Sequence, residues 1–145
     1  MFGRNNKLDT GWLADVALFD GFSQEQLSQV AELGQRVVVA AGSEIADQGR
    51  IGKECWVVVE GTANIVMNGE YITSVGAGSM IGEMALLEHR PRSAAVIADT
   101  DMVLVSFDTD GFNAILDKNP VAKDRVSSIL TRRLSDNLNR RSNEG

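Results

Sequence analysis

Apolar positions divide the chain into three regions with different periods. Between about Thr10 and Leu33, apolar residues recur every three or four positions, which predicts helices. From Gln35 to about Phe107 they fall into short β-rich runs broken by glycines and an Asn-Gly pair, which predicts strands and turns. From Thr109 onward the helical spacing returns. The pattern predicts a mainly β fold with flanking helices at both ends.

Local signals place the ends of several helices. Ser23 precedes Gln26 by three residues, a capping-box spacing that starts a helix, and Gly34 is a natural stop for it. A short helix after Thr109 must end before Asn119-Pro120, because proline disfavours helical backbone at the residue before it. The last helix carries an apolar stripe: Ala122, Val126, Ile129, Leu130, Leu134 and Leu138. Such a stripe packs on its own domain or forms a homodimer seam over residues 122–138, and spacing does not choose between them.

Six strands are predicted in the central region: Val37–Val39, Cys55–Val59, Ala63–Met67, Tyr71–Val75, Ala94–Ala98 and Val103–Phe107. Asn68-Gly69 lies between two of them, and both residues tolerate the positive φ of a two-residue type I′ hairpin. Many short strands with regular turns indicate a sandwich, jelly roll or β-roll rather than a parallel α/β sheet. The segment Trp56–Val59 is expected to be a buried strand and not a binding face.

Composition narrows the classes of protein. The chain has 145 residues, which suits a single domain over 1–145, and its net charge of −6 suits no protein that coats nucleic acid. The basic residues near the C-terminus, including Arg132 and Arg133, are interpreted as a solvated helix end, with a nucleic-acid patch as the alternative. No apolar run is long enough to span a membrane, and the polar N-terminus has no signal-peptide pattern. The single cysteine, Cys55, excludes an internal disulfide and favours the cytoplasm.

The histidine inventory argues against an enzyme. His89 is the only histidine, whereas a jelly-roll metalloenzyme needs several histidine ligands and a Ser-His or Cys-His nucleophile needs a histidine partner. These two enzyme classes are excluded on this inventory, and we expect a domain that is not an enzyme and holds no metal.

The segment from Ile81 to Val96 carries the candidate chemistry. It interrupts the β pattern with a helix-compatible piece whose first turn would present unpaired backbone N–H groups to an anion. Gly82 permits close approach of a ligand, and Arg92 adds a charged fork suited to the two free oxygens of a phosphate diester. Glu83 would repel phosphate but can accept hydrogen bonds from a sugar hydroxyl. From the residues alone, a surface loop with a salt bridge remains the competing interpretation.

These residues resemble the phosphate-binding cassette of the cyclic nucleotide-binding domain family. The family pattern is roughly G-E-x-A-L-L, a spacer, then R-[S/T]-A-[A/T]; the chain reads Gly82-Glu83-Met84-Ala85-Leu86-Leu87 and Arg92-Ser93-Ala94-Ala95. The likeness covers about residues 15–140, including the glycine framework. Two features depart from the family: Ile81 stands where many members have an aromatic residue, and the loop before Trp56 lacks the acidic Glu-Gly-Asp pattern.

The resemblance implies an eight-stranded antiparallel β-roll (a double-stranded β-helix or jelly roll) with N-terminal helices and a C-terminal helix pair. The N-terminal helices would span 10–34 and the roll 35–108, with the cassette at 81–96. The C-terminal helices would span 109–140.

The resemblance also implies ligand contacts. Glu83 would take the ribose 2′-hydroxyl and Arg92 the cyclic phosphate, with Ser93 bonding a phosphate oxygen or the base. Further contacts are implied for Gly82, the backbone amides of Met84, Ala85 and Ala94, the apolar walls Ile81 and Val75, and base-facing candidates Arg132, Arg133, Leu134 and Asn137 in the last helix.

The function implied is a cytoplasmic regulatory domain that binds a cyclic nucleotide and whose ligand reorients the C-terminal helices. Serine after the cassette arginine favours cAMP over cGMP. One alternative is a ligand-free β-roll that acts as an interaction or dimerisation module. Another is a fragment of a cAMP-responsive transcription regulator; too few residues follow Leu134 for a helix-turn-helix, so direct DNA binding is not expected.

Overall fold

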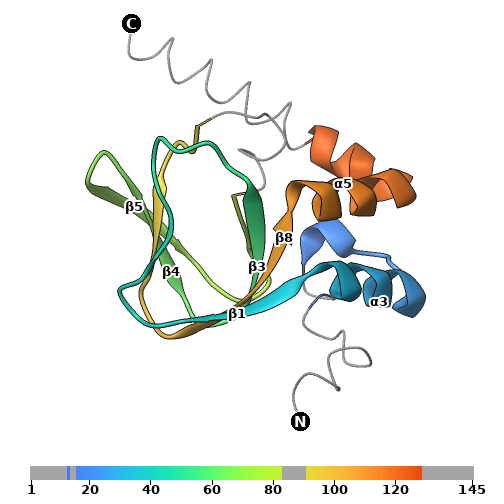
Figure 1. Ribbon diagram of the computed structural model, residues 1–145, viewed down its shortest axis with the longest axis horizontal. Helices are drawn as coiled ribbons and strands as arrows, with labels where there is room; N and C mark the ends of the chain where they lie inside the picture. The colour runs from blue at the N-terminus through green and yellow to red at the C-terminus, as the bar shows by residue number, and fades with distance from the viewer. Residues whose placement is uncertain (1–12, 14–15, 83–90, 129–145) are drawn as a thin grey trace, which may run out of the picture.

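The computed structural model describes residue 13 and the ranges 16–82 and 91–128. Eight strands and the helices beside them make up this part of the chain (Figure 1). The strands are β1 (Gln35–Val39), β2 (Glu44–Ala46), β3 (Glu54–Glu60), β4 (Ala63–Met67), β5 (Glu70–Val75), β6 (Met80–Ile81), β7 (Ala95–Ala98) and β8 (Met102–Asp108).

The strands form two four-stranded sheets in which every described pair is antiparallel. The first sheet has the order β1-β8-β3-β6, and the second has the order β2-β7-β4-β5. The expected antiparallel roll with flanking helices is confirmed. All six predicted strands are present with ends within two residues of the prediction. The two that the pattern missed, β2 and β6, are three and two residues long, too short for an alternating pattern to show.

The hairpin between β4 and β5 has the predicted turn. Asn68 and Gly69 have φ of 53° and 81°, so both adopt the left-handed backbone that a type I′ turn requires. Met67 pairs with Glu70 across the turn.

Helix α3 (Gln24–Leu33) begins with the predicted capping box. The Ser23 hydroxyl accepts from the Gln26 amide at 3.1 Å, and the Gln26 side chain accepts from the Ser23 amide at 2.8 Å. Before it, η1 (Ala17–Phe19) is a 3₁₀ turn where helical spacing predicted an α-helix. Helix α5 (Thr109–Lys118) ends before Asn119-Pro120 as predicted, and residues 120–128 are helical. In the part that the structure describes, no helix has the length and hydropathy to cross a bilayer.

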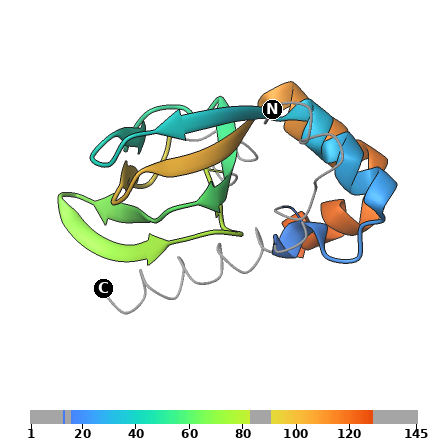
Figure 2. The same ribbon diagram turned by 90° about the horizontal axis from the view of Figure 1, so that it is seen from below.

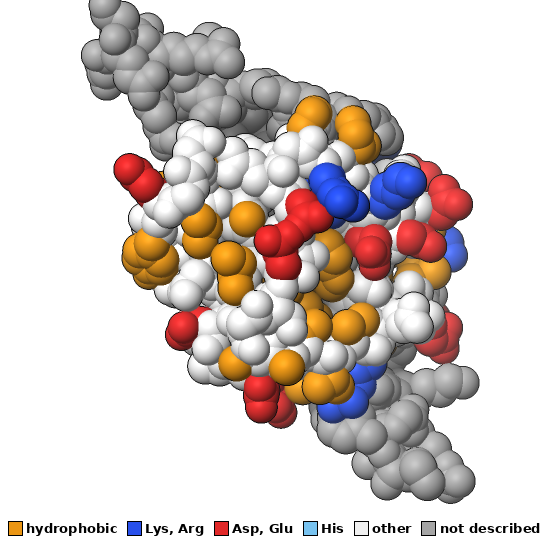
Figure 3. Space-filling view, turned by 60° about the vertical axis from the view of Figure 1, so that its left-hand side comes forward, with side chains coloured by type: hydrophobic (Ala, Val, Ile, Leu, Met, Phe, Trp, Pro, Cys, Tyr) orange, Lys and Arg blue, Asp and Glu red, His pale blue; other side chains and the backbone are white. Residues whose placement is uncertain are grey.

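The helices gather at one end of the roll, and the β4–β5 hairpin lies at the opposite end (Figures 1 and 2). Among the described residues, the side chains of β5 in the second sheet are exposed along most of the strand. Tyr71 on β5 is 62% exposed and Ile72 beside it 53%. Figure 3 brings this side forward and shows separate apolar groups among uncharged, acidic and basic side chains.

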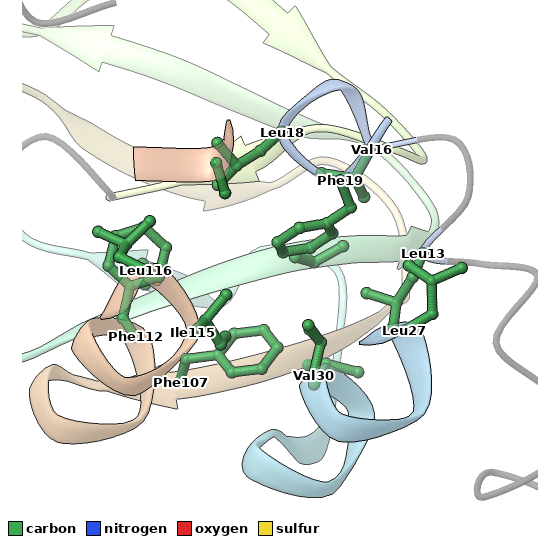
Figure 4. Close-up of a cluster of buried hydrophobic side chains, with 14 of the residues drawn as sticks. Leu13, Val16, Leu18, Phe19, Leu27, Val30, Phe107, Phe112, Ile115 and Leu116 are labelled. Atoms are coloured by element: carbon green, nitrogen blue, oxygen red, sulfur yellow. The ribbon is translucent and has the colours of Figure 1, made fainter. Parts of the chain in front are cut away.

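Helices and first sheet enclose a cluster that we call the helix-side core. Phe19, Val30, Phe107, Phe112 and Ile115 point toward one another within it (Figure 4). Its buried members among the described residues are Leu13, Val16, Leu18, Phe19, Leu27, Val30, Cys55, Val57, Val105, Phe107, Phe112, Ile115, Leu116, Ala122 and Val126. Ala122 and Val126 show that the first part of the C-terminal stripe packs on its own domain. Ile129, Leu130, Leu134 and Leu138 lie outside the described residues, so the structure does not test a dimer seam.

A second cluster, the roll-side core, fills the space between the two sheets. Its buried members are Ala46, Trp56, Val58, Ala63, Ile81, Val96, Ala98, Met102 and Leu104. Strand β3 contributes to both clusters because successive side chains point to opposite faces of a strand. Cys55 and Val57 face the helices, whereas Trp56 and Val58 face the roll interior.

Candidate functional site

The backbone of Arg92 is held by a loop from a distant part of the chain. Its amide donates to the Arg50 carbonyl at 2.7 Å, and its carbonyl accepts from the Gly49 amide at 2.8 Å. Pro91 forms an isolated antiparallel bridge with Ile51 next to these bonds. These two hydrogen bonds, on either side of the Arg92 backbone, fix the position from which its side chain starts.

The Arg92 guanidinium lies within the protein. The residue is 9% exposed; its Nη2 donates to the Glu54 carbonyl at 2.7 Å, and its Cζ lies 5.0 Å from the centroid of the Trp56 ring. Burial of a cation costs free energy unless hydrogen bonds, an aromatic face or an opposite charge compensate it. A guanidinium held in this way has the charge and the planar set of donors that bind a phosphate or carboxylate.

Gly82 lies directly against this guanidinium. It follows Ile81, the last residue of β6, which pairs with Trp56 on β3. Its φ is +81°, a backbone conformation that side chains strain, and a Cβ there would collide with Nη1 of Arg92 and lie 3.3 Å from the Glu54 carbonyl oxygen. The positive φ therefore favours glycine, and a side chain here would displace the Arg92 guanidinium from this position. We call Gly82, Glu54, Trp56 and Arg92 the arginine cluster.

The other predicted site residues have distinct positions. Ser93 is exposed and Ala94 half-buried, just before β7 begins. Ile81 is buried in the roll-side core, and Val75 packs against that core from the end of β5. The structure thus brings Gly82 and Arg92 together, and it puts both predicted apolar walls on the roll interior.

Seven predicted contacts lie outside the described residues: Glu83, Met84 and Ala85 of the cassette, and Arg132, Arg133, Leu134 and Asn137 of the last helix. The roles expected for them stay predictions.

Sequence reasoning missed two members of the arginine cluster. Trp56 is buried, as expected for its strand, and its ring also lies 5.0 Å from Cζ of Arg92, a contact that the strand pattern did not predict. Glu54 contributes through its backbone carbonyl, which no side-chain pattern can reveal. Arg92 is distant from both in the chain, so only the pairing of strands brings them together.

Metal chemistry finds no support in the described part of the chain. Among those residues, no group of three or more His, Cys, Asp or Glu side chains could hold a metal ion.

Comparison with known proteins gives the family. A family model described as cyclic nucleotide-binding domain matches residues 36–119. The cAMP-dependent protein kinase regulatory subunit of Schizosaccharomyces pombe is 32% identical over 114 residues, which cover 78% of this chain and 28% of that protein.

Solved structures agree with this assignment. The catabolite activator protein of Thermus thermophilus matches with a TM-score of 0.74 and 27% identity, over 82% of this chain and 58% of that one. The regulatory subunit of a cAMP-independent protein kinase A from Trypanosoma brucei matches with a TM-score of 0.75 over 86% of this chain and 48% of that one; at 21% identity this likeness concerns the fold alone. The chain spans less than two thirds of each of these three proteins. With more than half of its residues matched by the family model and its roll shared with these structures, the chain belongs to the cyclic nucleotide-binding domain family.

Proposed function

We propose that this domain binds a cyclic nucleotide in the roll, with the cyclic phosphate at Arg92. The observation that carries the proposal is the buried guanidinium packed against Gly82, the residue that opens the cassette. An arginine on a surface loop would be exposed, whereas the Arg92 side chain is buried. A buried guanidinium in a domain of this family supports phosphate binding, because its planar set of donors suits an anion.

The remaining contacts follow the family cassette. Glu83 binds the ribose 2′-hydroxyl, and Ser93 bonds a phosphate oxygen or the base. The other proposed contacts are Gly82, the backbone amides of Met84, Ala85 and Ala94, the walls Ile81 and Val75, and Arg133 or Asn137 over the base.

We propose cAMP as the preferred ligand. Serine at position 93 supports it, as does the likeness to a regulatory subunit named as cAMP-dependent. Calorimetry with both nucleotides tests the preference. The wild-type chain binds cAMP more tightly than cGMP, and Ser93→Thr reduces the difference between the two affinities. Equal affinities in the wild-type chain would contradict it.

The proposed role is regulatory and not catalytic, with binding transmitted to the C-terminal helices. A ligand shifts helices only if it binds one arrangement more tightly than the other. Strand β3 supports such a link: Glu54, whose carbonyl binds Arg92, pairs with Asp108 on β8, and the Asp108 side chain caps helix α5 by accepting from the Gly111 amide at 2.7 Å. Hydrogen exchange of α5 amides with and without nucleotide tests the link, and identical exchange would contradict it.

The decisive test of binding is calorimetry on Arg92→Ala. Removal of a charged partner of a buried anion costs about 2–5 kcal/mol, so cAMP affinity falls by roughly thirty-fold or more. Arg36→Ala is the matched control, because Arg36 is an exposed arginine on β1, and it leaves the affinity unchanged. Unchanged affinity in Arg92→Ala would reject the assigned role.

A second candidate is a ligand-free β-roll that acts as an interaction module. The Trypanosoma brucei structure supports this candidate, because the same fold occurs there in the regulatory subunit of a protein kinase A that is named as cAMP-independent. The same calorimetry decides between the candidates. A wild-type chain that gives no heat of binding and no thermal shift with millimolar cAMP or cGMP would favour the module.

A further inference from the structure

The Trp56 ring is a fixed surface under the Arg92 guanidinium. Trp56 lies in β3, where it pairs with Ile81 on one side and Ser106 on the other. Its side chain is 8% exposed and belongs to the roll-side core. Strand pairing on both sides and close packing leave the ring little freedom to move.

The guanidinium lies at cation–π distance from that ring. The 5.0 Å between Cζ of Arg92 and the ring centroid is within the range of about 6 Å in which the negative face of an indole attracts a cation. Tryptophan gives the strongest of these interactions, and they strengthen where water is excluded, as at this buried pair.

We infer that Trp56 is a positioning residue, which holds the Arg92 guanidinium in place for the phosphate. This inference rests on the proposed function, in which Arg92 binds the cyclic phosphate. An arginine side chain loses considerable rotamer freedom when it is ordered for binding. The Trp56 ring and the Glu54 carbonyl hold the Arg92 guanidinium in place before the ligand arrives. Binding is therefore tighter than it would be with an equally charged but mobile arginine.

The test compares two replacements of Trp56 by cAMP calorimetry. Trp56→Leu keeps an apolar side chain without a π face, and its affinity falls by about ten-fold, within the range that cation–π contacts contribute. Trp56→Phe keeps an aromatic face, and its affinity stays within about three-fold of wild type. Unchanged affinity in Trp56→Leu, or an equal loss in both variants, would overturn the inference.

Val58→Ala separates positioning from damage to the core. Val58 is fully buried in the same strand and the same cluster as Trp56. Val58→Ala is therefore expected to lower the stability of the protein. Its melting temperature falls while its cAMP affinity stays at the wild-type value. An affinity loss in Val58→Ala equal to that in Trp56→Leu would show that any core damage weakens binding, and would overturn the inference.

A double-mutant cycle with Arg92 distinguishes a positioning role of Trp56 from a purely structural one. In the Arg92→Ala background there is no guanidinium to position, so Trp56→Leu leaves the residual cAMP affinity unchanged. A full ten-fold loss in that background would assign the effect to something other than Arg92. A wild-type chain that binds neither cAMP nor cGMP overturns the proposed function and this inference together, whereas tight wild-type binding with an unaffected Trp56→Leu variant overturns this inference alone.

Discussion

The two sheets of the roll have four strands each but different surroundings. In the first sheet, β3 and β8 each have long runs of buried residues, because helices cover one face and the roll interior the other. In the second sheet, β7 alternates between half-buried and buried residues and β5 is exposed along almost all its length. A strand covered on both faces reads as a continuous apolar run, and one covered on a single face does not.

The comparison shows which sheet can connect the candidate site to the helices. Strand β3 of the first sheet touches both: Trp56 faces Arg92, while its neighbours Cys55 and Val57 lie in the helix-side core. The outer face of the second sheet, by contrast, carries solvent-exposed side chains such as Tyr71. We therefore expect substitutions behind the first sheet to have large effects and those on the outer face of the second to have small ones.

The largest effect is expected from Phe107→Ala in the helix-side core. Phe107 on β8 is 1% exposed, and its removal leaves a cavity between the first sheet and the helices. The free energy of unfolding falls by about 3–5 kcal/mol. Urea denaturation measures this loss. If the alanine variant does not fold, Phe107→Leu is measured instead; it removes fewer buried atoms, so a loss of about 1–2 kcal/mol is expected. A loss in Phe107→Ala as small as that expected for Phe107→Leu would contradict the comparison.

A smaller loss is expected from Asn119→Ala, which removes a buried polar contact between the helices. The Asn119 side chain accepts from Gln26 Nε2 at 3.0 Å and donates to the Ile115 carbonyl at 2.7 Å. Unsatisfied buried partners cost about 1–3 kcal/mol in denaturation experiments. Asn64→Ala is the control, because its hydrogen bond from Ser74 lies on the open sheet, where a loss within about 0.5 kcal/mol is expected. Equal losses in the two variants would remove the distinction between the helix side of the first sheet and the exposed side of the second.

Gly69→Ala tests the hairpin of the open sheet. A Cβ at Gly69 would meet no atom within 4 Å, so the cost comes from its φ of +81° alone. The expected loss of unfolding free energy is about 1–2 kcal/mol. Gly76→Ala, after β5, lacks the positive φ and would make only ordinary contacts, so the melting temperature of that variant should not fall. An unchanged Gly69→Ala variant would argue against the turn geometry.

The smallest effect is expected from Tyr71→Ala on the outer face of the second sheet. Its hydroxyl lies 2.8 Å from the Ser74 hydroxyl, but the contact is exposed. The free energy of unfolding should change by no more than about 0.5 kcal/mol. A loss comparable to that of Phe107→Ala would show that this face is part of a packed interface.

Local signals in the sequence identified several features correctly. The capping box at Ser23, the hairpin at Asn68-Gly69 and the end of α5 before Pro120 each depend on backbone preferences within a few residues. The cassette motif likewise identified Gly82 and Arg92, which the structure brings into contact.

Other features depended on residues far apart in the chain. Gly34 was predicted as a helix stop, and α3 does end before it, but its φ of −93° is ordinary. Glycine is needed there because a Cβ would collide with Val105 and lie 2.9 Å from the Phe107 ring on β8. The contact between Arg92 and Trp56 also depends on residues far apart in the chain. So does the choice of which sheet the helices cover.

The sequence by itself determined the succession of helices, strands and turns and the residues of the cassette, because short-range backbone energetics and a compact motif decide both. Only the tertiary structure decided that Trp56 lies under Arg92 and that β3 separates the roll interior from the helices. Those relations depend on the register of strands distant in the chain, and a one-residue shift in register would point each side chain of β3 to the opposite face.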